Sequence, residues 1–539
     1  FIYYLFINNS FINMKIRRIQ IKNYKSIESL DISSFDSLNI LIGKNDAGKS
    51  NILGALDILF NSNIKFYTGL ELIKEDFLET IFKGDATYYL FDKNNPEIEI
   101  TAYIDMSKKK LEKLGIETSE EENELVISKK ITIQKNNTRI TLDFLRFNKN
   151  KIIKTPDENK RFMVKKSAYS DKIEDSIGKD ILEKISNEFI LIPADRNIVR
   201  DPSPGSEKMK AEDYIKDSLI TLANSKEEDK KKLFEQFTSF ISKISPLINK
   251  VEPIIEKGIV IDLKFLNSER TNIPLSTIGG GNNELLLLLH EIILSGGKIL
   301  AIEEPEIHLH PEAQRKLYRF MEEFSQTTQM IISTHAALFV QPNNLNGLFR
   351  VVKKGPKTEV FGVSKEEYLD KERLEQELNA ENCEMFFADK VLLVEGISDE
   401  IMMEGLISKY CKSTDEVKVV SCYSKDNFGV YIKLLKIFKI SYIVMTDLDS
   451  LKGRFQIKPI WKEIKGKQLK TRDEKIAYLK TRGIHVLSRG ALEQSYPNKY
   501  RRGVSKPLDA LYTLHELTRE DYDSETMKDL KAVVEALEK

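Results

Sequence analysis

The alternation of apolar and polar residues near the start of the chain predicts strands that flank one helix. Basic and apolar residues alternate from Met14 to Lys25, which is typical of a half-buried β-strand. The apolar run 38–42 predicts a buried strand, and apolar residues then recur at helical spacing over 51–60. Later strand-like segments predict an antiparallel β layer at 97–104, 124–133 and 138–147.

The pattern in the middle of the chain is mainly helical. A helical composition covers 173–189 and ends in the strand-like segment 190–192. From Ala211 to about Ile255, charged and apolar residues alternate at a helical period. We interpret 201–255 as a helical insertion, which serves either as a dimerisation arm or as a cap on the preceding domain. The two interpretations are equally supported by the sequence.

In the remainder of the chain, short buried strands are interspersed with helices, and we therefore assign the chain to the α/β class. The very apolar segment 285–294 predicts a buried helix, and the last segment, Glu516 to Lys539, predicts one charged helix. Strands are predicted at 298–302, 329–332, 391–394, 441–446 and 484–487.

Length and composition limit the class of protein. At 539 residues the chain is too long for one core, and it predicts roughly three or four domains. Lys plus Arg and Asp plus Glu both number 83, so any attraction to nucleic acid needs local charge. The cysteines Cys383, Cys411 and Cys422 lie far apart, which argues against a zinc module and a disulfide scaffold and favours a reducing cytoplasm.

Residues 1–13 do not fit the rest of the pattern. Their apolar run, 1–7, is too short to span a bilayer and lacks the basic start of a signal peptide. We therefore expect no membrane partner, a biological start at Met14, and a leader at 1–13 that is non-native or disordered.

The first chemical motif is the loop GKNDAGKS at 43–50, which fits the phosphate-binding pattern GxxxxGK[ST]. Its glycines stand where a Cβ would keep a triphosphate away from the backbone N–H groups. Lys49 is expected to neutralise the β- and γ-phosphates of ATP, and Ser50 is expected to hold Mg²⁺. The predicted ATP contacts in this loop are Gly43, Asn45, Gly48, Lys49 and Ser50.

Three further segments carry groups suited to a nucleotide site. A buried strand delivers two acids, and we assign Glu303 to Mg²⁺ and Glu304 to the general base that polarises the attacking water. His335 follows another buried strand, where it can sense a γ-phosphate. The cluster LSTIGGGNNE begins the apolar helix with N–H groups that can bind phosphate oxygens, from Ser276, Gly279, Gly280 and Gly281.

Together, GKNDAGKS, LSTIGGGNNE, ILAIEEPEIHLHP and IISTHAAL resemble the Walker A, signature, Walker B with D-loop, and H-loop segments of an ABC-type ATPase of the SMC-like branch. The resemblance implies a head-to-tail dimer in which the signature of one subunit completes the ATP site of another. The chain departs from the family at Glu303, where Asp is usual, in its signature, and in lacking a recognisable Q-loop glutamine. These departures imply hydrolysis that is slow or coupled to a partner.

A second set of acids lies at the ends of later strands. Glu395 follows a buried strand and Asp399 lies four residues on at a helix start, so both carboxylates can face one point. Asp447 and Asp449 end another strand and can approach from one face. Hard oxygen donors without His or Cys favour Mg²⁺ or Mn²⁺, and Glu493 is a further candidate ligand.

The segments LVEGISDE and DLDS resemble the two motifs of a Toprim domain, a strand-end glutamate followed by glycine and a later DxD. Together with EEPEIHLHP, they identify the chain from Met14 onward as similar to the overcoming-lysogenisation-defect (OLD) family of endonucleases. The resemblance implies an ABC-type P-loop ATPase domain at 14–200 and 256–378, interrupted by the insertion 201–255, and a Rossmann-like Toprim nuclease domain at 379–539.

Local charge between Ser450 and Lys506 supports a nucleic-acid substrate. This segment has sixteen Lys and Arg residues and four acids, a net charge of +12 in a neutral chain. Such a segment beside a metal cluster can neutralise several phosphates, although a solvated basic face is the alternative. Lys506 resembles the late lysine of the family, which can stabilise transition-state charge, with Arg502 as the alternative. The predicted DNA contacts are Lys452, Arg454, Arg501 and Arg502.

The resemblance implies an ATP-regulated, divalent-metal-dependent DNA endonuclease, with Glu304, Asp447 and Lys506 as its catalytic residues. Asp447 would bridge two ions ~4 Å apart. The head-to-tail ATP site implies a homo-oligomer. Members such as the Gabija and retron-associated nucleases act in antiphage defence with partner proteins, so the resemblance also implies a defence role and a second component, either a helicase or a reverse transcriptase with its nucleic acid. The alternative from a different class is an SMC-like, ATP-driven DNA clamp or tether whose Toprim domain is not catalytic.

Overall fold

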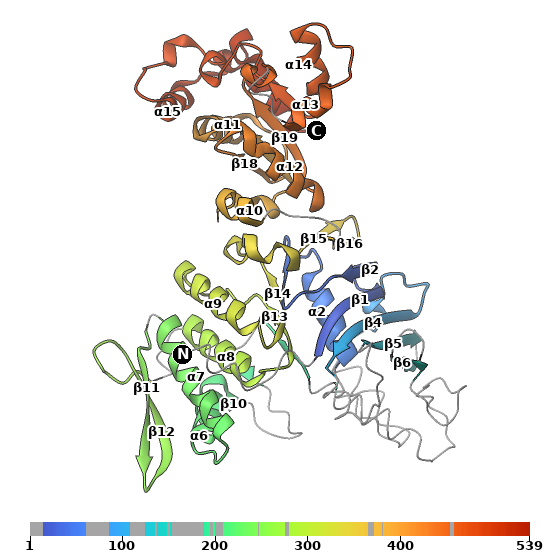
Figure 1. Ribbon diagram of the computed structural model, residues 1–539, viewed down its shortest axis with the longest axis vertical. Helices are drawn as coiled ribbons and strands as arrows, with labels where there is room; N and C mark the ends of the chain where they lie inside the picture. The colour runs from blue at the N-terminus through green and yellow to red at the C-terminus, as the bar shows by residue number, and fades with distance from the viewer. Residues whose placement is uncertain are drawn as a thin grey trace. The chain divides into compact units, whose positions relative to one another are not determined.

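The computed structural model of the protein describes residues 14–60, 86–107, 124–134, 137–147, 151–152, 185, 188–194, 198–199, 209–245, 247–274, 280–364, 371–379, 381–452 and 458–539. The leader 1–13 and most of the helical segment predicted at 173–189 lie outside these residues. The chain divides into two compact units, which run from blue to yellow and from yellow to red in Figure 1: Phe1–Phe339 with Asn346–Val360, and Val340–Leu345 with Phe361–Lys539.

The first unit contains an antiparallel sheet in the order β2-β1-β4-β5-β6-β7, which confirms the predicted antiparallel layer. In a regular strand, residues three positions apart face opposite sides of the sheet. A β-bulge between Ile16 and Arg18 changes this alternation, so Ile16 and Ile19 both enter the same core. The strands are β1 (Met14–Tyr24), β2 (Ile27–Ser33), β4 (Glu97–Met106), β5 (Glu124–Gln134), β6 (Asn137–Phe147) and β7 (Lys151–Ile152).

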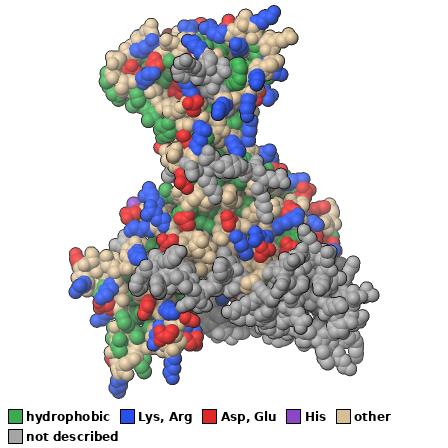
Figure 2. Space-filling view, viewed as in Figure 1, with side chains coloured by type: hydrophobic (Ala, Val, Ile, Leu, Met, Phe, Trp, Pro, Cys, Tyr) green, Lys and Arg blue, Asp and Glu red, His purple; other side chains and the backbone are tan. Residues whose placement is uncertain are grey.

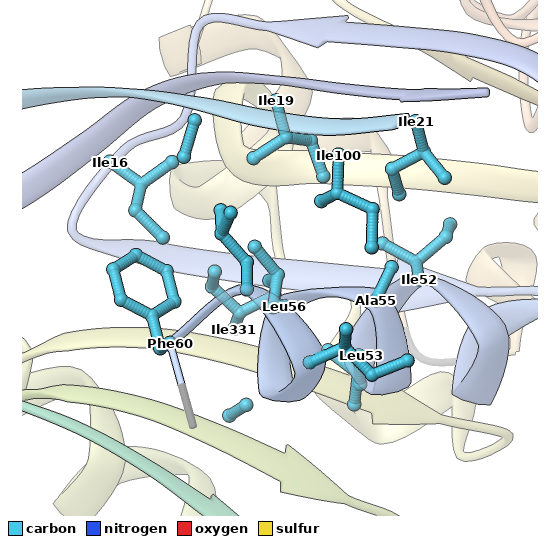
Figure 3. Close-up of a cluster of buried hydrophobic side chains, with 14 of the residues drawn as sticks. Ile16, Ile19, Ile21, Ile52, Leu53, Ala55, Leu56, Phe60, Ile100 and Ile331 are labelled. Carbon is cyan, nitrogen blue, oxygen red and sulfur yellow. The ribbon is translucent and has the colours of Figure 1, made fainter. Parts of the chain in front are cut away.

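Helix α2 (Lys49–Phe60) packs against this sheet, and Figure 3 shows the side chains between them. Ile21 and Ile100 from the sheet lie over Ile52 and Leu56 of the helix. The apolar residues of α2 repeat at helical spacing, as predicted. Each such side chain contributes about 1.5–3 kcal/mol by leaving water. The helix that follows the 43–50 loop is therefore fixed in place by a dry core.

A second sheet carries the predicted nucleotide-binding segments. Its order is β16-β15-β3-β14-β13-β8, and the strands from β15 to β8 run parallel. Its central strands β3, β14 and β13 are almost entirely buried, as expected for a parallel sheet covered on both faces. The carboxyl ends of parallel strands meet at one edge. The strands are β3 (Leu38–Ile42), β8 (Phe189–Ile192), β13 (Ile299–Glu303), β14 (Gln329–Thr334), β15 (Leu348–Lys354) and β16 (Lys357–Gly362).

The predicted insertion is helical only in part. Helices α6 and α7 pack on α8, and α7 also packs on α9. The helical prediction is wrong beyond Ile244, because the chain there forms the hairpin β11–β12. Lys257 and Gly258 both have positive φ (50° and 81°), as a two-residue hairpin turn requires. The elements are β9 (Ile198–Val199), β10 (Met209–Lys210), α6 (Ala211–Ala223), α7 (Glu228–Ile244), β11 (Lys250–Glu256), β12 (Ile259–Leu266), α8 (Gly280–Leu294) and α9 (Pro311–Phe324).

The second unit is built on a parallel sheet in the order β18-β17-β19-β20. Helices α11 and α12 connect successive strands, in the Rossmann-like arrangement that was predicted (Figure 1). The strand order reverses between β17 and β19, and such a switch point is the usual place for a ligand in an open α/β sheet. The elements are α10 (Lys371–Glu377), β17 (Lys390–Val394), α11 (Ile397–Tyr410), β18 (Val417–Ser421), α12 (Phe428–Ile437), β19 (Ser441–Thr446), α13 (Lys458–Ile464), α14 (Arg472–Lys480), β20 (Ile484–Val486) and α15 (Lys506–Glu516).

The end of the chain differs from its prediction as one helix over Glu516–Lys539. It forms two helices, α16 (Arg519–Tyr522) and α17 (Lys528–Leu537). Helix α15 ends at Glu516, with the extended Leu517 after it, and Thr518 caps α16 by accepting a hydrogen bond from the N–H of Asp521. Helix α17 then packs on α11 and β19. Among the described residues, every helix is too short or too polar to span a bilayer.

Candidate active sites

The loop between β3 and α2 holds two glycines in places that other residues do not tolerate. Gly43 has a φ of 151° and Gly48 a φ of 108°. A Cβ on Gly43 would lie 2.1 Å from the carbonyl oxygen of Val351, and a Cβ on Gly48 would lie 2.3 Å from the hydroxyl of Thr358. The backbone therefore follows a tight path that only glycine permits, which is the shape that lets N–H groups wrap a phosphate.

Lys49 places a buried positive charge inside this loop. Its ammonium donates hydrogen bonds to the carbonyl oxygens of Gly43 (2.8 Å) and Lys44 (3.0 Å). Burial lowers the pKa of Lys49 to about 8, although the nearby acids, Glu304 first, act in the opposite direction. The phosphate groups of a bound nucleotide would give this ammonium a negatively charged partner.

His335 and Glu304 approach the same ammonium from the ends of β14 and β13. The Nε2 of His335 lies 2.8 Å from Lys49 Nζ and 3.3 Å from Glu304 Oε1. Burial, followed by the charge of Lys49, lowers the pKa of His335, which favours the neutral imidazole at this position. The predicted general base and the predicted phosphate sensor thus lie beside the P-loop lysine.

The structure adds Glu306, which sequence reasoning did not single out. Its Oε1 accepts hydrogen bonds from the hydroxyl of Thr334 (2.6 Å) and from the backbone N–H of His335 (2.7 Å). Glu306 is the third acid of the segment EEPE, but its contact depends on β14 lying beside β13. This carboxylate fixes the backbone that presents His335.

The other predicted ATP contacts are spread more widely. Glu303 ends β13, while Asn45 and Ser50 are exposed in the loop and in the first turn of α2. Gly280 and Gly281 begin α8. The predicted contacts Ser276 and Gly279 lie outside the described residues.

In the second unit, acids at the ends of β17 and β19 meet at the switch point of the sheet. The Oε1 of Glu395 accepts hydrogen bonds from the hydroxyl of Thr446 and from the N–H of Asp447 (2.7 Å). One carboxylate oxygen from each of Glu395, Asp447 and Asp449 lies within 4.8 Å of the other two. The structure therefore brings together residues that lie about fifty positions apart in the chain.

Asp399 faces the same group from the start of α11. Its Oδ2 accepts a hydrogen bond from the N–H of Gly396 (3.0 Å). Burial, followed by repulsion from Glu395, raises the pKa of Asp399 to about 7, and the same two causes raise the pKa of Asp447 to about 7. Carboxylates that repel each other in a partly enclosed site are stabilised by a cation, and an all-oxygen donor set fits Mg²⁺ or Mn²⁺.

A lysine that sequence reasoning missed enters this cluster. Lys425 lies in the loop after β18, and its ammonium forms ion pairs with Asp449 Oδ1 and with Glu395 Oε2, the latter at 3.4 Å. The apolar run that forms β18, followed by Ser-Lys-Asp-Asn, was the available signal. Only the strand order shows that this loop borders the acids at the end of β17.

Lys506 begins α15, and its ammonium lies 2.8 Å from Glu493 Oε1. The alternative, Arg502, stacks over the ring of Tyr512 at 4.1 Å and pairs with Glu516. Among the described residues, Lys506 lines the cleft over the acids and Arg502 does not. That cleft has a volume of about 490 Å³, and its charged lining includes Glu395, Asp399, Lys425, Asp447, Glu493 and Lys506.

The predicted DNA contacts belong to the same unit. Lys452 is exposed just beyond Asp449, and Arg501 is exposed with its guanidinium 5.5 Å from the centre of the Tyr496 ring. Arg454 lies outside the described residues. Figure 2 shows many Lys and Arg side chains, in blue, on the visible face of this unit, with acids between them.

Comparison with known families matches both parts of the chain. Residues 14–340 match the AAA ATPase domain family, and residues 386–449 match the family described as overcoming lysogenization defect protein-like, TOPRIM domain. The chain is 33% identical to an OLD nuclease of Thermus scotoductus, over 28% of this chain and 30% of that protein. It thus spans less than a third of that relative's length.

Two further relatives are matched over more of their length. An ATP/GTP phosphatase of Helicobacter pylori is 24% identical, over 60% of this chain and 86% of that protein. Endonuclease GajA of Bacillus cereus is 20% identical, over 90% of this chain and 84% of that protein. The two family matches confirm that an ATPase domain precedes a Toprim domain, as the motifs predicted. The chain belongs to the AAA ATPase domain family and joins this ATPase domain to an OLD-like TOPRIM domain.

Proposed function

We propose that this protein is an ATP-regulated, divalent-metal-dependent DNA endonuclease. The proposal is carried by the convergence of Glu395, Asp447 and Asp449 at the switch point of a TOPRIM domain, with Lys506 in the wall of the same cleft. It is supported by similarity to proteins named OLD nuclease and endonuclease GajA.

The acids of the cluster would hold Mg²⁺ or Mn²⁺. Such an ion, when bound, activates water and stabilises the leaving oxygen of a phosphodiester. The hydrogen bonds from Thr446 and the Asp447 N–H orient Glu395 in advance, because they occupy its Oε1 from the end of β19. Asp447 ends β19 beside Glu395 and Asp449, and we expect its loss to cost most. Asp399 and Asp449 are the further ligands, and Glu493 borders the same cleft.

Lys506 would stabilise the charge that develops on the scissile phosphate. Its side chain is 70% exposed, so it can move from Glu493 to a phosphate without leaving a buried contact. Lys452 and Arg501, with Arg454 and Arg502, would hold the DNA backbone on either side of the cleft. Binding through such contacts should weaken steeply with salt.

The ATPase site would control this nuclease. Lys49 and the loop glycines would bind the β- and γ-phosphates, while Ser50 and Glu303 hold Mg²⁺. Glu304 would orient the attacking water, and His335 would contact the γ-phosphate. The glycine cluster that begins α8 would complete the ATP site of a second copy, so we propose a homo-oligomer.

The biological setting is part of the same proposal. Resemblance to the OLD family supports a role in antiphage defence in the cytoplasm, with a second component that is a helicase or a reverse transcriptase with its nucleic acid. The three cysteines, Cys383, Cys411 and Cys422, are free thiols, which fits a reducing compartment.

A second candidate is an ATP-driven DNA clamp or tether whose TOPRIM domain is inert. The observation that favours it is the Lys425 ammonium, which lies within the acidic cluster where a cation would bind. Against it stands the complete set of acids, which a tether has no need to keep.

The test is cleavage of supercoiled and linear DNA by the full chain with Mg²⁺, Mn²⁺ or EDTA, each with and without ATP. The proposal expects cutting that requires the metal and changes with ATP. Cutting that persists in EDTA would contradict the metal site. DNA binding without cutting in any condition, including with a defence partner, would favour the tether.

A further inference from the structure

The ammonium of Lys425 lies among the carboxylates of the acidic cluster, where a metal cation would bind. It pairs with Asp449 Oδ1 and with Glu395 Oε2, two of the three acids whose oxygens lie within 4.8 Å of one another. The Lys425 side chain is 21% exposed and that of Glu395 is 14% exposed. This ion pair is therefore shielded from water far better than an ordinary surface pair.

The loop that carries Lys425 is anchored independently of the acids. The Ser424 hydroxyl accepts a hydrogen bond from the N–H of Asp426 (3.3 Å), and Asn427 Nδ2 donates to the carbonyl of Cys422 (3.0 Å). Arg373, from α10, donates to the carbonyl of Asp426 (2.9 Å). Contacts on both sides thus hold Lys425 at the cleft, so its position is built into the fold.

The contacts of Glu395 limit what else can bind there. Its Oε1 already accepts two hydrogen bonds from the end of β19, and its Oε2 faces Lys425. A divalent ion at the Glu395–Asp449 side would lie within a few ångströms of the ammonium, where like charges repel strongly. Asp447 contributes the third oxygen of the cluster, and Asp399 lines the same cleft, so acids remain there to hold one divalent ion.

We propose that Lys425 takes the place of a second metal ion beside Glu395 and Asp449, so that the TOPRIM domain holds one divalent ion per chain, with Asp447 among its ligands. The inference rests on the proposed function, since it requires that the cluster binds a metal. It replaces the two-ion arrangement expected from the sequence by one ion and one ammonium. Lys425 is then a positioning and charge-neutralising residue of the nuclease centre.

The experiment counts Mn²⁺ bound to the full chain without nucleotide, by the electron paramagnetic resonance signal of free Mn²⁺. The variants are Lys425→Met, Lys425→Arg and the matched control Lys436→Met, which removes an exposed lysine of α12. Asp447→Ala identifies the ions that belong to the cluster. Thermal unfolding of each variant establishes that it is folded.

We expect one Asp447-dependent ion in the wild type, in Lys425→Arg and in Lys436→Met. Lys425→Met should take up a second ion, with an affinity for it about tenfold or more above any in the wild type, because the repelling charge is gone. Two ions in the wild type overturn the inference and leave the nuclease proposal intact, and so does a folded Lys425→Met variant that binds one ion. No Asp447-dependent ion in any variant would overturn the metal site itself, and with it the proposed function.

Discussion

The Nζ of Lys49 lies 2.8 Å from the Nε2 of His335, so the start of α2, which follows the 43–50 loop, and the end of β14 meet at one place. The contact follows from the register of the sheet, in which β3 and β14 are parallel neighbours and Ile42 pairs with Thr334. Glu304 completes the group from β13, the next strand. A phosphate at this edge would meet a cation, an imidazole and a carboxylate together.

Glu304→Gln should separate ATP binding from ATP turnover. The amide keeps the shape of the side chain but cannot polarise water, and loss of a general base costs about 100-fold or more in rate. Phosphate release measures turnover, and a fluorescent ATP analogue measures binding. Glu312→Gln, at an exposed position of α9, is the control. Turnover near the wild-type rate in Glu304→Gln would show that another group acts as the base.

Gly48→Ala should weaken nucleotide binding by displacing the 43–50 loop. The new Cβ would lie 2.3 Å from the Thr358 hydroxyl, at a φ of 108°, so the loop must move away from its phosphate-binding path. We expect ATP affinity to fall by about tenfold or more, because several N–H donors lose their alignment. Fluorescence titration with an ATP analogue makes the measurement.

The matched control for that substitution is Gly297→Ala. Gly297 also has a positive φ (84°), but its added Cβ meets nothing within 4 Å. It should cost about 1 kcal/mol of stability through backbone strain and leave ATP binding intact. Equal losses of ATP affinity in the two variants would mean that strain, and not the blocked loop, is responsible.

Lys506→Ala and Arg502→Ala should differ in their effect on DNA cleavage. Lys506 borders the cleft beside Glu493, whereas Arg502 is engaged by Tyr512 and Glu516. We expect Lys506→Ala to lower the cleavage rate by about 100-fold and Arg502→Ala to act mainly on DNA affinity. Rates at saturating DNA measure the first effect, and the salt dependence of binding measures the second. The reverse pattern would assign the transition-state role to Arg502.

Lys129 should make the stability of the first unit depend on pH. Lys129 is a buried residue of β5, and its ammonium donates a hydrogen bond to the carbonyl of Ile58 (2.7 Å). Burial lowers its pKa to about 8 from 10.5. Between these values the unfolded chain binds more protons than the folded one, so the free energy of unfolding rises with pH across this window.

Chemical denaturation from pH 8 to pH 10.5 compares the wild type with Lys129→Met, which lacks the titrating group. The wild type should gain up to about 3 kcal/mol relative to the variant across this range. The control Lys130→Met removes a neighbouring lysine whose ammonium pairs with Glu97 at a partly exposed position. The wild type should show no such gain relative to this control, because both keep Lys129. A constant difference between wild type and Lys129→Met would mean that burial does not lower the pKa of Lys129, which would then stay charged in the folded state across this range.

The acids of both sites could be predicted because each follows a buried strand. Glu304, Glu395 and Asp447 each directly follow the last residue of a strand, and parallel strands bring such ends to one edge. The motifs around them also resemble known families, which fixed the order of the domains.

The residues that sequence reasoning missed depend on strand order and on turns. Lys425 reaches Glu395 because β18 lies beside β17, and Glu306 reaches His335 because β14 lies beside β13. Neither order can be read from local periodicity. The hairpin after Ile244 was missed since Lys257 and Gly258 give a weak turn signal within a charged segment.

The most direct test of the nuclease centre is the rate of supercoiled-DNA cleavage by Asp447→Asn, measured beside its affinity for the same DNA. Asp473→Asn, at an exposed position in the basic segment, is the matched control. The account predicts a rate lower by about 100-fold or more in Asp447→Asn, with DNA affinity kept and the control unchanged. Cleavage by Asp447→Asn at the wild-type rate would contradict the assignment of the acidic cluster as the catalytic centre.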